Sequence, residues 1–174
     1  DFSSGTPSVI DVGSGAGFPG LPIKISYPNT EMTLLDSTAK KVEFMRHIID
    51  LLGLRGARAV WARVEEYAEE NREAYDVALC RALAPLNIAS ELCLPLIRKG
   101  GLFLAMKGKN AGPETQAALK AIELLGGRLE RTVKVLIQGP EKEGPERSIV
   151  VIRKVASTPD KYPRRTGAAR KRPL

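Results

Sequence analysis

The sequence has little of three residue types on which many enzymes depend. Its 174 residues include two cysteines, one histidine and only 5% aromatic side chains. Two thiols do not build a disulfide framework, so a reduced, cytoplasmic protein is expected. The lone histidine, His47, lies inside a predicted helix and away from strand ends, which argues against a histidine-based catalytic dyad. The scarcity of aromatic rings argues against a broad surface for stacking nucleic-acid bases.

Long hydrophobic runs are also missing. No apolar run approaches the roughly 18 residues that a membrane-spanning helix needs, and no secretory signal pattern opens the chain. The 43% hydrophobic and 27% charged residues are typical of a globular domain with a substantial core. We therefore expect a monomer with neither a membrane partner nor a metal site. The chain opens with Asp1 and Phe2 and reaches a strand-like run almost at once, so we expect that a preceding segment is missing.

Positive charge is concentrated at one end of the sequence. The net charge is +7, and residues 161–174 hold six lysines and arginines with no acid, which leaves +1 for residues 1–160. We therefore divide the chain into a domain, 1–160, and a basic C-terminal segment, 161–174. Such a segment either binds a polyanion through phosphate contacts and counterion release or is a low-complexity, solubilising tail. The charge alone does not separate these two roles.

Short apolar runs alternate with segments of helical periodicity. Strands are predicted at 9–12, 32–35, 59–61, 75–80, 102–106, 131–138 and 147–154, and helices near 21–25, 38–53, 65–72, 86–98 and 113–125. Strict alternation of strand and helix requires crossover connections, which build a parallel sheet with helices on both faces. The last two strands are joined by the Gly/Pro-rich turn 139–146 without a helix, so they should form an antiparallel hairpin at one edge.

A glycine-rich loop follows the first predicted strand, in the stretch 10-IDVGSGAGFPG-20. Glycine permits positive φ and lets a ligand touch the backbone directly. The helix that begins near Pro19 presents free N–H groups and the positive end of its dipole, which favours an anionic group. A purely structural turn is a poor explanation for four glycines together with two placed acids, Asp11 and Asp36.

Two ligands fit this loop. The segment 15-GAGFPG-20 matches the dinucleotide pattern G-x-G-x-x-G, with Asp36 placed for ribose hydroxyls. The segment from Asp11 to Gly17 reads D-x-G-x-G-x-G and resembles the first motif of class I S-adenosylmethionine-dependent methyltransferases. A pyrophosphate would be repelled by Asp11, whereas S-adenosylmethionine offers an ammonium to that acid and a carboxylate to the helix end. The pattern therefore favours an α/β, Rossmann-like class I methyltransferase fold with a mostly parallel seven-stranded sheet.

Six stretches extend the resemblance over essentially the whole chain. In order they are 11-DVGSGAGFPGLPIKI-25, 36-DSTAKKVEFM-45, 62-ARVEEY-67, 80-CRALAPL-86, 106-MKGK-109 and 161-KYPRRTGAARKRPL-174. Together they resemble the bacterial 16S rRNA guanine-N7 methyltransferase G family (RsmG), also called glucose-inhibited division protein B (GidB). The resemblance implies methyl transfer from S-adenosyl-L-methionine to N7 of a guanosine in the decoding-centre (530) loop of 16S rRNA. Two features depart from the family pattern: the family's N-terminal helical segment is absent, and Cys80 stands where Ser is expected.

The same resemblance implies roles for individual residues. Gly13, Gly15 and Phe18 would line the methionine and adenosine part of the pocket, Asp36, Ser37 and Thr38 would lie at the ribose, and Val64 and Glu65 would flank the adenine. Arg81 would stand at the mouth between cofactor and base. Guanine N7 has an exposed lone pair and needs no general base, so catalysis would rest on alignment.

Arg81 is the best single candidate for a catalytic residue. It follows the fourth predicted strand, and its guanidinium can donate to guanine O6, stack on the ring or bind a phosphate. Its alternative role is a structural pair with an acid. Cys80 beside it should pack as a small apolar residue, because N7 needs no covalent adduct.

Four further cations are predicted to contact RNA phosphates: Lys107, Lys109, Arg164 and Arg165, with Tyr162 as a stacking face. The expected partner is 16S rRNA or the assembling small ribosomal subunit.

Three other functions stay open: a small-molecule methyltransferase, which the basic segment disfavours; an NAD-binding oxidoreductase, which Asp11 disfavours; and a non-catalytic RNA-binding module.

Overall fold

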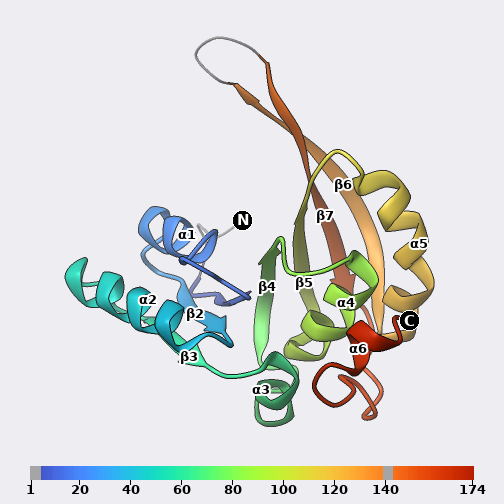
Figure 1. Cartoon of the computed structure of the whole chain (residues 1–174), viewed down its shortest axis with the longest axis horizontal. Helices are drawn as coiled ribbons and strands as arrows, with labels where there is room; N and C mark the ends of the chain where they lie inside the picture. The colour runs from blue at the N-terminus through green and yellow to red at the C-terminus, as the bar shows by residue number, and fades with distance from the viewer. Residues whose placement is uncertain (1–4, 139–142) are drawn as a thin grey trace.

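The computed structural model describes residues 5–138 and 143–174 and shows a seven-stranded sheet between helices (Figure 1). The sheet has the strand order β3-β2-β1-β4-β5-β7-β6. Strands β1 to β5 pair in parallel, and β7 pairs antiparallel with both β5 and β6. The predicted mostly parallel sheet with an antiparallel edge hairpin is confirmed. The strands are β1 (Ser8–Val12), β2 (Glu31–Asp36), β3 (Ala57–Trp61), β4 (Tyr75–Arg81), β5 (Ile97–Lys107), β6 (Gly127–Gln138) and β7 (Glu143–Lys154).

Helices cover both faces of the sheet. Because successive strand residues point to opposite faces, Val9 packs in the core beneath α1 and α2, and Ile10 packs in the core beneath the other helices. Ile25 in α1 is exposed, whereas Lys24 is buried, and the carbonyls of Pro28 and Thr30 accept its ammonium protons. The helices are α1 (Gly20–Ser26), α2 (Ala39–Leu51), α3 (Val64–Glu70), α4 (Leu86–Cys93), α5 (Ala111–Leu124) and α6 (Ala168–Lys171).

The chain between α4 and β5 differs from the prediction of one helix over 86–98. Helix α4 ends at Cys93, and a 3₁₀ turn, η1 (Leu94–Leu96), follows it. Pro95 has no N–H to donate and cannot continue the α-helix. Strand β5 then begins at Ile97, well before the predicted start at 102. Glycine permits this at Gly101, where a Cβ would lie 2.5 Å from the carbonyl oxygen of Asp76 on β4.

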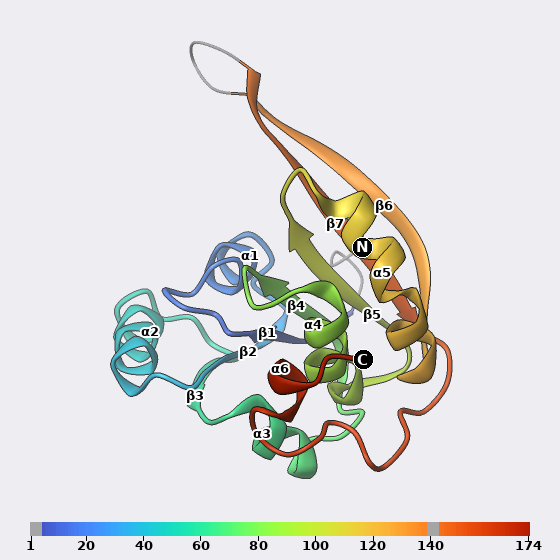
Figure 2. The ribbon, with the colours of Figure 1, turned by 45° about the vertical axis from the view of Figure 1, so that its right-hand side comes forward.

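Strands β6 and β7 extend beyond the sheet as a hairpin arm, which we define as residues 135–138 and 143–147 (Figures 1 and 2). The last residue of β5, Lys107, pairs with Ser148, so the arm continues past the carboxyl end of β5. Part of the turn predicted at 139–146, residues 139–142, lies outside the described residues. The arm thus projects from the edge of the sheet at which ligands bind in folds of this kind.

The basic segment 161–174 packs onto the domain, and we call it the C-terminal strap. It contains α6, which lies beside α4 (Figures 1 and 2). Tyr162 and Ala169 of the strap are buried. Glu91 on α4, whose side chain is 1% exposed, accepts hydrogen bonds from Arg164 Nε at 2.8 Å and Nη2 at 2.5 Å. The interpretation of this segment as a low-complexity tail is wrong, because composition does not show which cations meet buried carboxylates.

We predict that Arg164→Ala destabilises the fold by about 3–5 kcal/mol, since it leaves the buried Glu91 carboxylate without its charged partner. The adjacent Arg165 is exposed, so Arg165→Ala should change stability by about 0.5 kcal/mol or less. Urea unfolding at neutral pH measures both variants. Equal stability of the two would contradict a structural role for the Glu91–Arg164 pair.

Candidate cofactor site

The glycine loop after β1 is held against the end of β2 by its own backbone. The N–H groups of Gly13 and Ser14 both donate to the carbonyl of Leu35, at 2.8 and 3.1 Å. Gly13 has φ +71°, a region that disfavours side chains, and a Cβ there would lie 2.7 Å from Leu83 Cδ1. The backbone conformation therefore favours glycine at this position, and any side chain there would also have to move the end of the Leu83 side chain.

Asp36 joins the first loop to the second. It ends β2, and its Oδ2 accepts the N–H of Gly15 at 3.0 Å, while Oδ1 accepts the N–H of Thr38 at 2.9 Å. The residue is 7% exposed, and Lys41 Nζ lies 3.8 Å from Oδ2. Each carboxylate oxygen can accept more than one hydrogen bond, so Asp36 retains acceptor capacity for a ribose hydroxyl.

Asp11 lies beneath the same loop and is fully buried. Its Oδ2 accepts the N–H of Gly20 at the start of α1, at 2.9 Å, and its Oδ1 has no hydrogen-bond partner among the described residues. Burial raises the pKa of Asp11 from 3.8 to about 6, although the hydrogen bond from Gly20 and the charge of Arg81 oppose the rise. Asp11 is thus an acid held in the interior with one acceptor unused.

A hollow opens at the carboxyl ends of β1, β2 and β3. Five of the predicted cofactor residues lie on its wall: Gly13, Asp36, Ser37, Val64 and Glu65. The predicted Gly15 and Thr38 contact that wall through Asp36. The prediction missed several wall residues, since apolar positions and distant segments carry no motif signal: Val12, Leu35, Ala62, Arg63, Leu83, Leu92 and Arg170.

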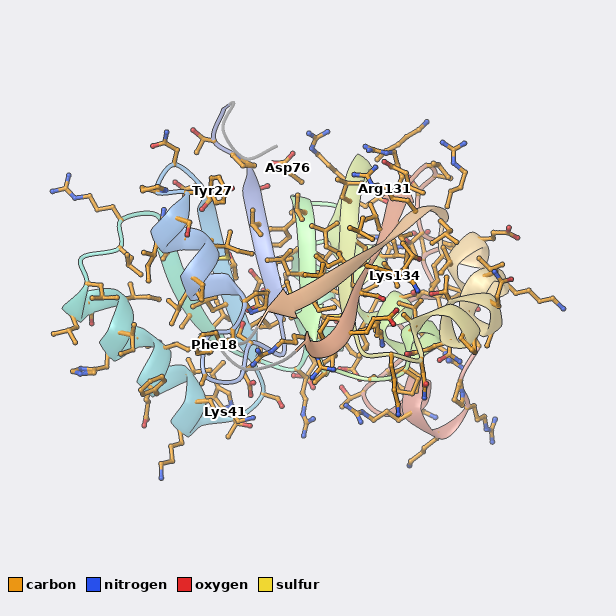
Figure 3. All side chains as sticks on the ribbon, turned by 90° about the horizontal axis from the view of Figure 1, so that it is seen from above. Phe18, Tyr27, Lys41, Asp76, Arg131 and Lys134 are labelled. Carbon is orange, nitrogen blue, oxygen red and sulfur yellow. The ribbon has the colours of Figure 1, made fainter. Side chains whose placement is uncertain are left out.

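Phe18 and Arg81, the other two predicted cofactor residues, form a pair. Arg81 Cζ lies 5.5 Å from the centroid of the Phe18 ring, within the range of a cation–π contact. Phe18 is 47% exposed and stands in the loop before α1 (Figure 3). Arg81 ends β4, and the next residue, Ala82, has φ +55°, which is unusual for a residue with a side chain. The pair therefore presents a ring and a guanidinium to solvent beside the glycine loop.

Two of the cations predicted to contact RNA have partners within the chain. Lys107 Nζ lies 2.7 Å from Glu114 Oε1 and donates to the carbonyl of Ala84, and the same Glu114 oxygen accepts the N–H of Leu86. Lys107 therefore fixes the loop between β4 and α4. Arg164 is bound to Glu91 as described above, whereas Lys109 and Arg165 are exposed.

A larger hollow lies at the opposite edge of the sheet, at the amino ends of β1 to β4. Its polar groups bind one another: Arg58 donates to the hydroxyls of Thr33 and Tyr75, and the Tyr75 hydroxyl lies 2.5 Å from that of Tyr67. Burial and the Tyr75 hydrogen bond raise the pKa of Tyr67 to about 12. Size alone does not make this hollow the cofactor site, because the glycine loop and both acids lie at the other edge.

Comparison with known proteins identifies the chain. A family model described as rRNA small subunit methyltransferase G matches residues 2–157. The chain belongs to this family. A relative named ribosomal RNA small subunit methyltransferase G from Pelotomaculum thermopropionicum is 47% identical over 169 residues, which cover 96% of this chain and 70% of the relative. The relative of the same name from Staphylococcus carnosus is 42% identical over 170 residues, with the same coverage.

Solved structures share the fold of this methyltransferase. M. jannaschii TYW2 in complex with AdoMet has a TM-score of 0.69 at 12% identity, covering 88% of this chain and 72% of that one. Precorrin-6y C5,15-methyltransferase from Geobacter metallireducens has a TM-score of 0.65 at 15% identity, covering 87% of this chain and 82% of that one. The class I methyltransferase fold predicted from the sequence is confirmed.

The residues of this methyltransferase fit S-adenosylmethionine. Asp36 could supply acceptors for the ribose diol, Val64 and Leu83 could supply apolar surface for the adenine, and the glycine loop could supply backbone for the methionine part. Asp11 is not on the wall, so it would act on the ammonium through the loop or a water, and its unpaired Oδ1 suits such a contact. This chain is an S-adenosylmethionine-dependent methyltransferase.

Within residues 5–138 and 143–174, no group of three or more His, Cys, Asp or Glu side chains is arranged to hold a metal ion. No helix in these ranges combines the length and apolar character that crossing a bilayer requires. Cys80 is buried, as expected for a small apolar residue, and His47 is exposed on α2.

We predict that Asp11→Asn makes the free protein more stable relative to wild type as pH rises. A carboxyl whose pKa is raised by folding contributes stability below its unfolded value, and that contribution is lost as pH rises through about 6. The stability difference between variant and wild type should therefore grow by up to about 3 kcal/mol between pH 3 and pH 7. Urea unfolding across this range tests it, and a difference independent of pH would contradict the assignment.

Proposed function

We propose that this chain transfers the methyl group of S-adenosylmethionine to N7 of a guanosine in the decoding-centre (530) loop of 16S rRNA. The match to rRNA small subunit methyltransferase G over residues 2–157 supports an rRNA substrate. The observation that carries the choice of base is the Phe18–Arg81 pair beside the glycine loop, a ring and a guanidinium suited to a purine with an acceptor at O6.

S-adenosylmethionine supplies an electrophilic methyl group on a sulfonium. Guanine N7 attacks with a lone pair that is unprotonated near neutral pH, so no residue has to remove a proton. The protein's contribution is alignment and exclusion of water, which can supply about 7–11 kcal/mol of the barrier in favourable cases. Asp36 and Glu65 would fix the nucleoside part of the cofactor, while the glycine loop fixes its other end.

Arg81 would orient the base. A guanidinium can bind guanine through both O6 and N7, but a donor on N7 would occupy the lone pair that must attack. We therefore assign Arg81 a contact to O6 or to the ring face, which leaves N7 free. Arg81 is exposed at the end of β4 and pairs with a ring, so it can exchange partners without disturbing the core.

Phosphate contacts would come from the exposed cations around this edge. Lys109 follows β5, and Arg147 of the hairpin arm has Nη1 3.9 Å from the point where a Cβ on Gly108 would lie. The strap contributes Arg165, which is exposed. Lys107 and Arg164 would act indirectly, because their partners Glu114 and Glu91 hold them in the structure.

We predict that Arg81→Ala lowers methyl transfer to 16S rRNA by about 100-fold, because a misaligned base loses most of the benefit of positioning. The fold should be unaffected, since the side chain is exposed. Transfer of tritiated methyl groups to naked 16S rRNA and to isolated small subunits measures the rate. Mass mapping of the product nucleotides identifies the methylated atom and position.

Arg55→Ala is the matched control. Arg55 is an exposed arginine in the connection between α2 and β3, near the amino end of β3 and therefore at the edge of the sheet opposite Arg81. The variant should transfer methyl groups at the wild-type rate. Normal turnover by Arg81→Ala would remove Arg81 from the mechanism. Methylation at another base or atom would overturn the proposed target, and methylation of small molecules alone would indicate the small-molecule class.

We predict that the double variant Lys109→Ala, Arg165→Ala binds 16S rRNA more weakly and with a lower salt dependence. The slope of log affinity against log salt should fall by about 1 for each phosphate contact removed. Filter binding between low and physiological salt measures the slope. The control is the double variant Lys99→Ala, Lys120→Ala, which removes the same charge from the start of β5 and from α5. An equal loss of affinity and slope in this control would contradict a specific RNA contact by Lys109 and Arg165.

A further inference from the structure

Three contacts fasten the C-terminal strap to the domain. Arg72, after α3, donates from Nη1 to the carbonyl of Tyr162 at 2.7 Å. Glu91 on α4 holds Arg164, and Asn87 at the start of α4 donates to the backbone oxygen of Leu174 at 3.0 Å. These anchors lie before and after the part of the strap that reaches the cofactor hollow, so that part is held in a defined position.

Glu65 connects the strap to the adenine side of the hollow. It lies in the first turn of α3 and on the wall of the hollow, and its Oε1 accepts the N–H of Gly167 at 3.0 Å. Next to it, Glu66 Oε1 accepts the hydroxyl of Thr166 at 3.2 Å. The carboxylate that the cofactor would meet is therefore oriented by a backbone group of the strap. Gly167 has φ +80°, which an L side chain resists.

Arg170 brings a positive charge to the same wall. It lines the hollow together with Val64, Glu65 and Leu83, and its Nη2 donates to the carbonyl of Leu83 at 3.3 Å. The neighbouring Ala169 is buried against α4, which fixes the backbone from which Arg170 projects. The other cations near the end of the chain, Lys171 and Arg172, are exposed and are not wall residues.

We propose that the strap completes the cofactor site and that Arg170 is a cofactor-binding residue at its adenosine end. Asp36 lies at the ribose position and the glycine loop at the methionine position, so a residue beside Val64 and Leu83 faces the adenine. A guanidinium there can stack on the purine or donate to a ring nitrogen. The hydrogen bond from Arg170 to the Leu83 carbonyl is long, which leaves most of its donors for a ligand.

The proposal concerns the binding of S-adenosylmethionine and is independent of which nucleotide is methylated. It also affects how a truncation of the strap would be interpreted. Removing residues 161–174 would delete the partner of the buried Glu91 and one wall of the hollow, so lost RNA binding by that variant would not isolate an RNA contact. Point variants are needed instead.

Calorimetry with the full chain tests the proposal, with S-adenosylhomocysteine and 5′-deoxy-5′-methylthioadenosine as ligands. The second ligand has the adenosine part but lacks the amino-acid part. Arg170→Ala should weaken both by about ten-fold, because a stacked or charged donor is lost at the part they share. The ratio of the two affinities should stay at its wild-type value. Arg172→Ala removes the same charge away from the hollow and should leave both affinities unchanged.

Each other outcome overturns the proposal. Wild-type affinities in Arg170→Ala would exclude Arg170 from the site, and equal weakening by Arg172→Ala would reduce the effect to net charge. Weakening of S-adenosylhomocysteine binding alone would place Arg170 at the amino-acid end.

Gly167→Ala is a second variant. No atom lies within 4 Å of the added Cβ, but the positive φ of this residue is strained for alanine. The strap should therefore shift, and the affinities for both ligands should fall. Urea unfolding of each variant separates a lost fold from a lost contact, and methyl transfer to RNA is not needed for the result.

Discussion

The geometry of the site depends on two carboxylates at the ends of neighbouring strands. Asp36 at the end of β2 accepts the N–H of Gly15, and Asp11 in β1 accepts the N–H of Gly20. Between them they fix the loop that leads into α1 at both ends. The arrangement also places two acids close to each other, and burial raises the pKa of Asp11. A bound ammonium group would relieve this cost, so the site is destabilised on its own in a way that its cationic cofactor can compensate.

The proposed reaction explains why the site holds so little conventional acid–base machinery. Because guanine N7 is already unprotonated, catalysis requires its alignment with the methyl group and the exclusion of water. Many residues hold the elements of the site in position, and several of them do so without lining the hollow themselves. Lys107 and Glu114 hold the loop that carries Leu83, and Glu91 and Arg164 hold the strap that reaches Glu65. Two of the cations predicted to contact RNA, Lys107 and Arg164, are therefore parts of this framework.

Periodicity and the glycine pattern were sufficient to predict the fold, and five of the predicted cofactor residues lie on the wall of the hollow. Alternating strands and helices determine a parallel sheet, the glycine motif marks Gly13, and the end of the next strand marks Asp36. The wall residues Leu83 and Arg170 could not be found in this way. Leu83 follows Ala82, whose φ is positive, and Arg170 belongs to a distant segment that Glu91 and Arg72 fasten to the domain. Local sequence does not reveal contacts between residues that are far apart in the chain.

The hairpin arm has an evolutionary consequence. Its strands pair with each other beyond the last residue of β5, and the glycine loop and the strap both lie on other elements (Figures 1 and 2). Adding or removing pairs of residues within the arm would therefore change its length while β5 and β7 keep their register. No described residue of the arm lines the hollow at the glycine loop, so the projecting surface and that hollow can change separately.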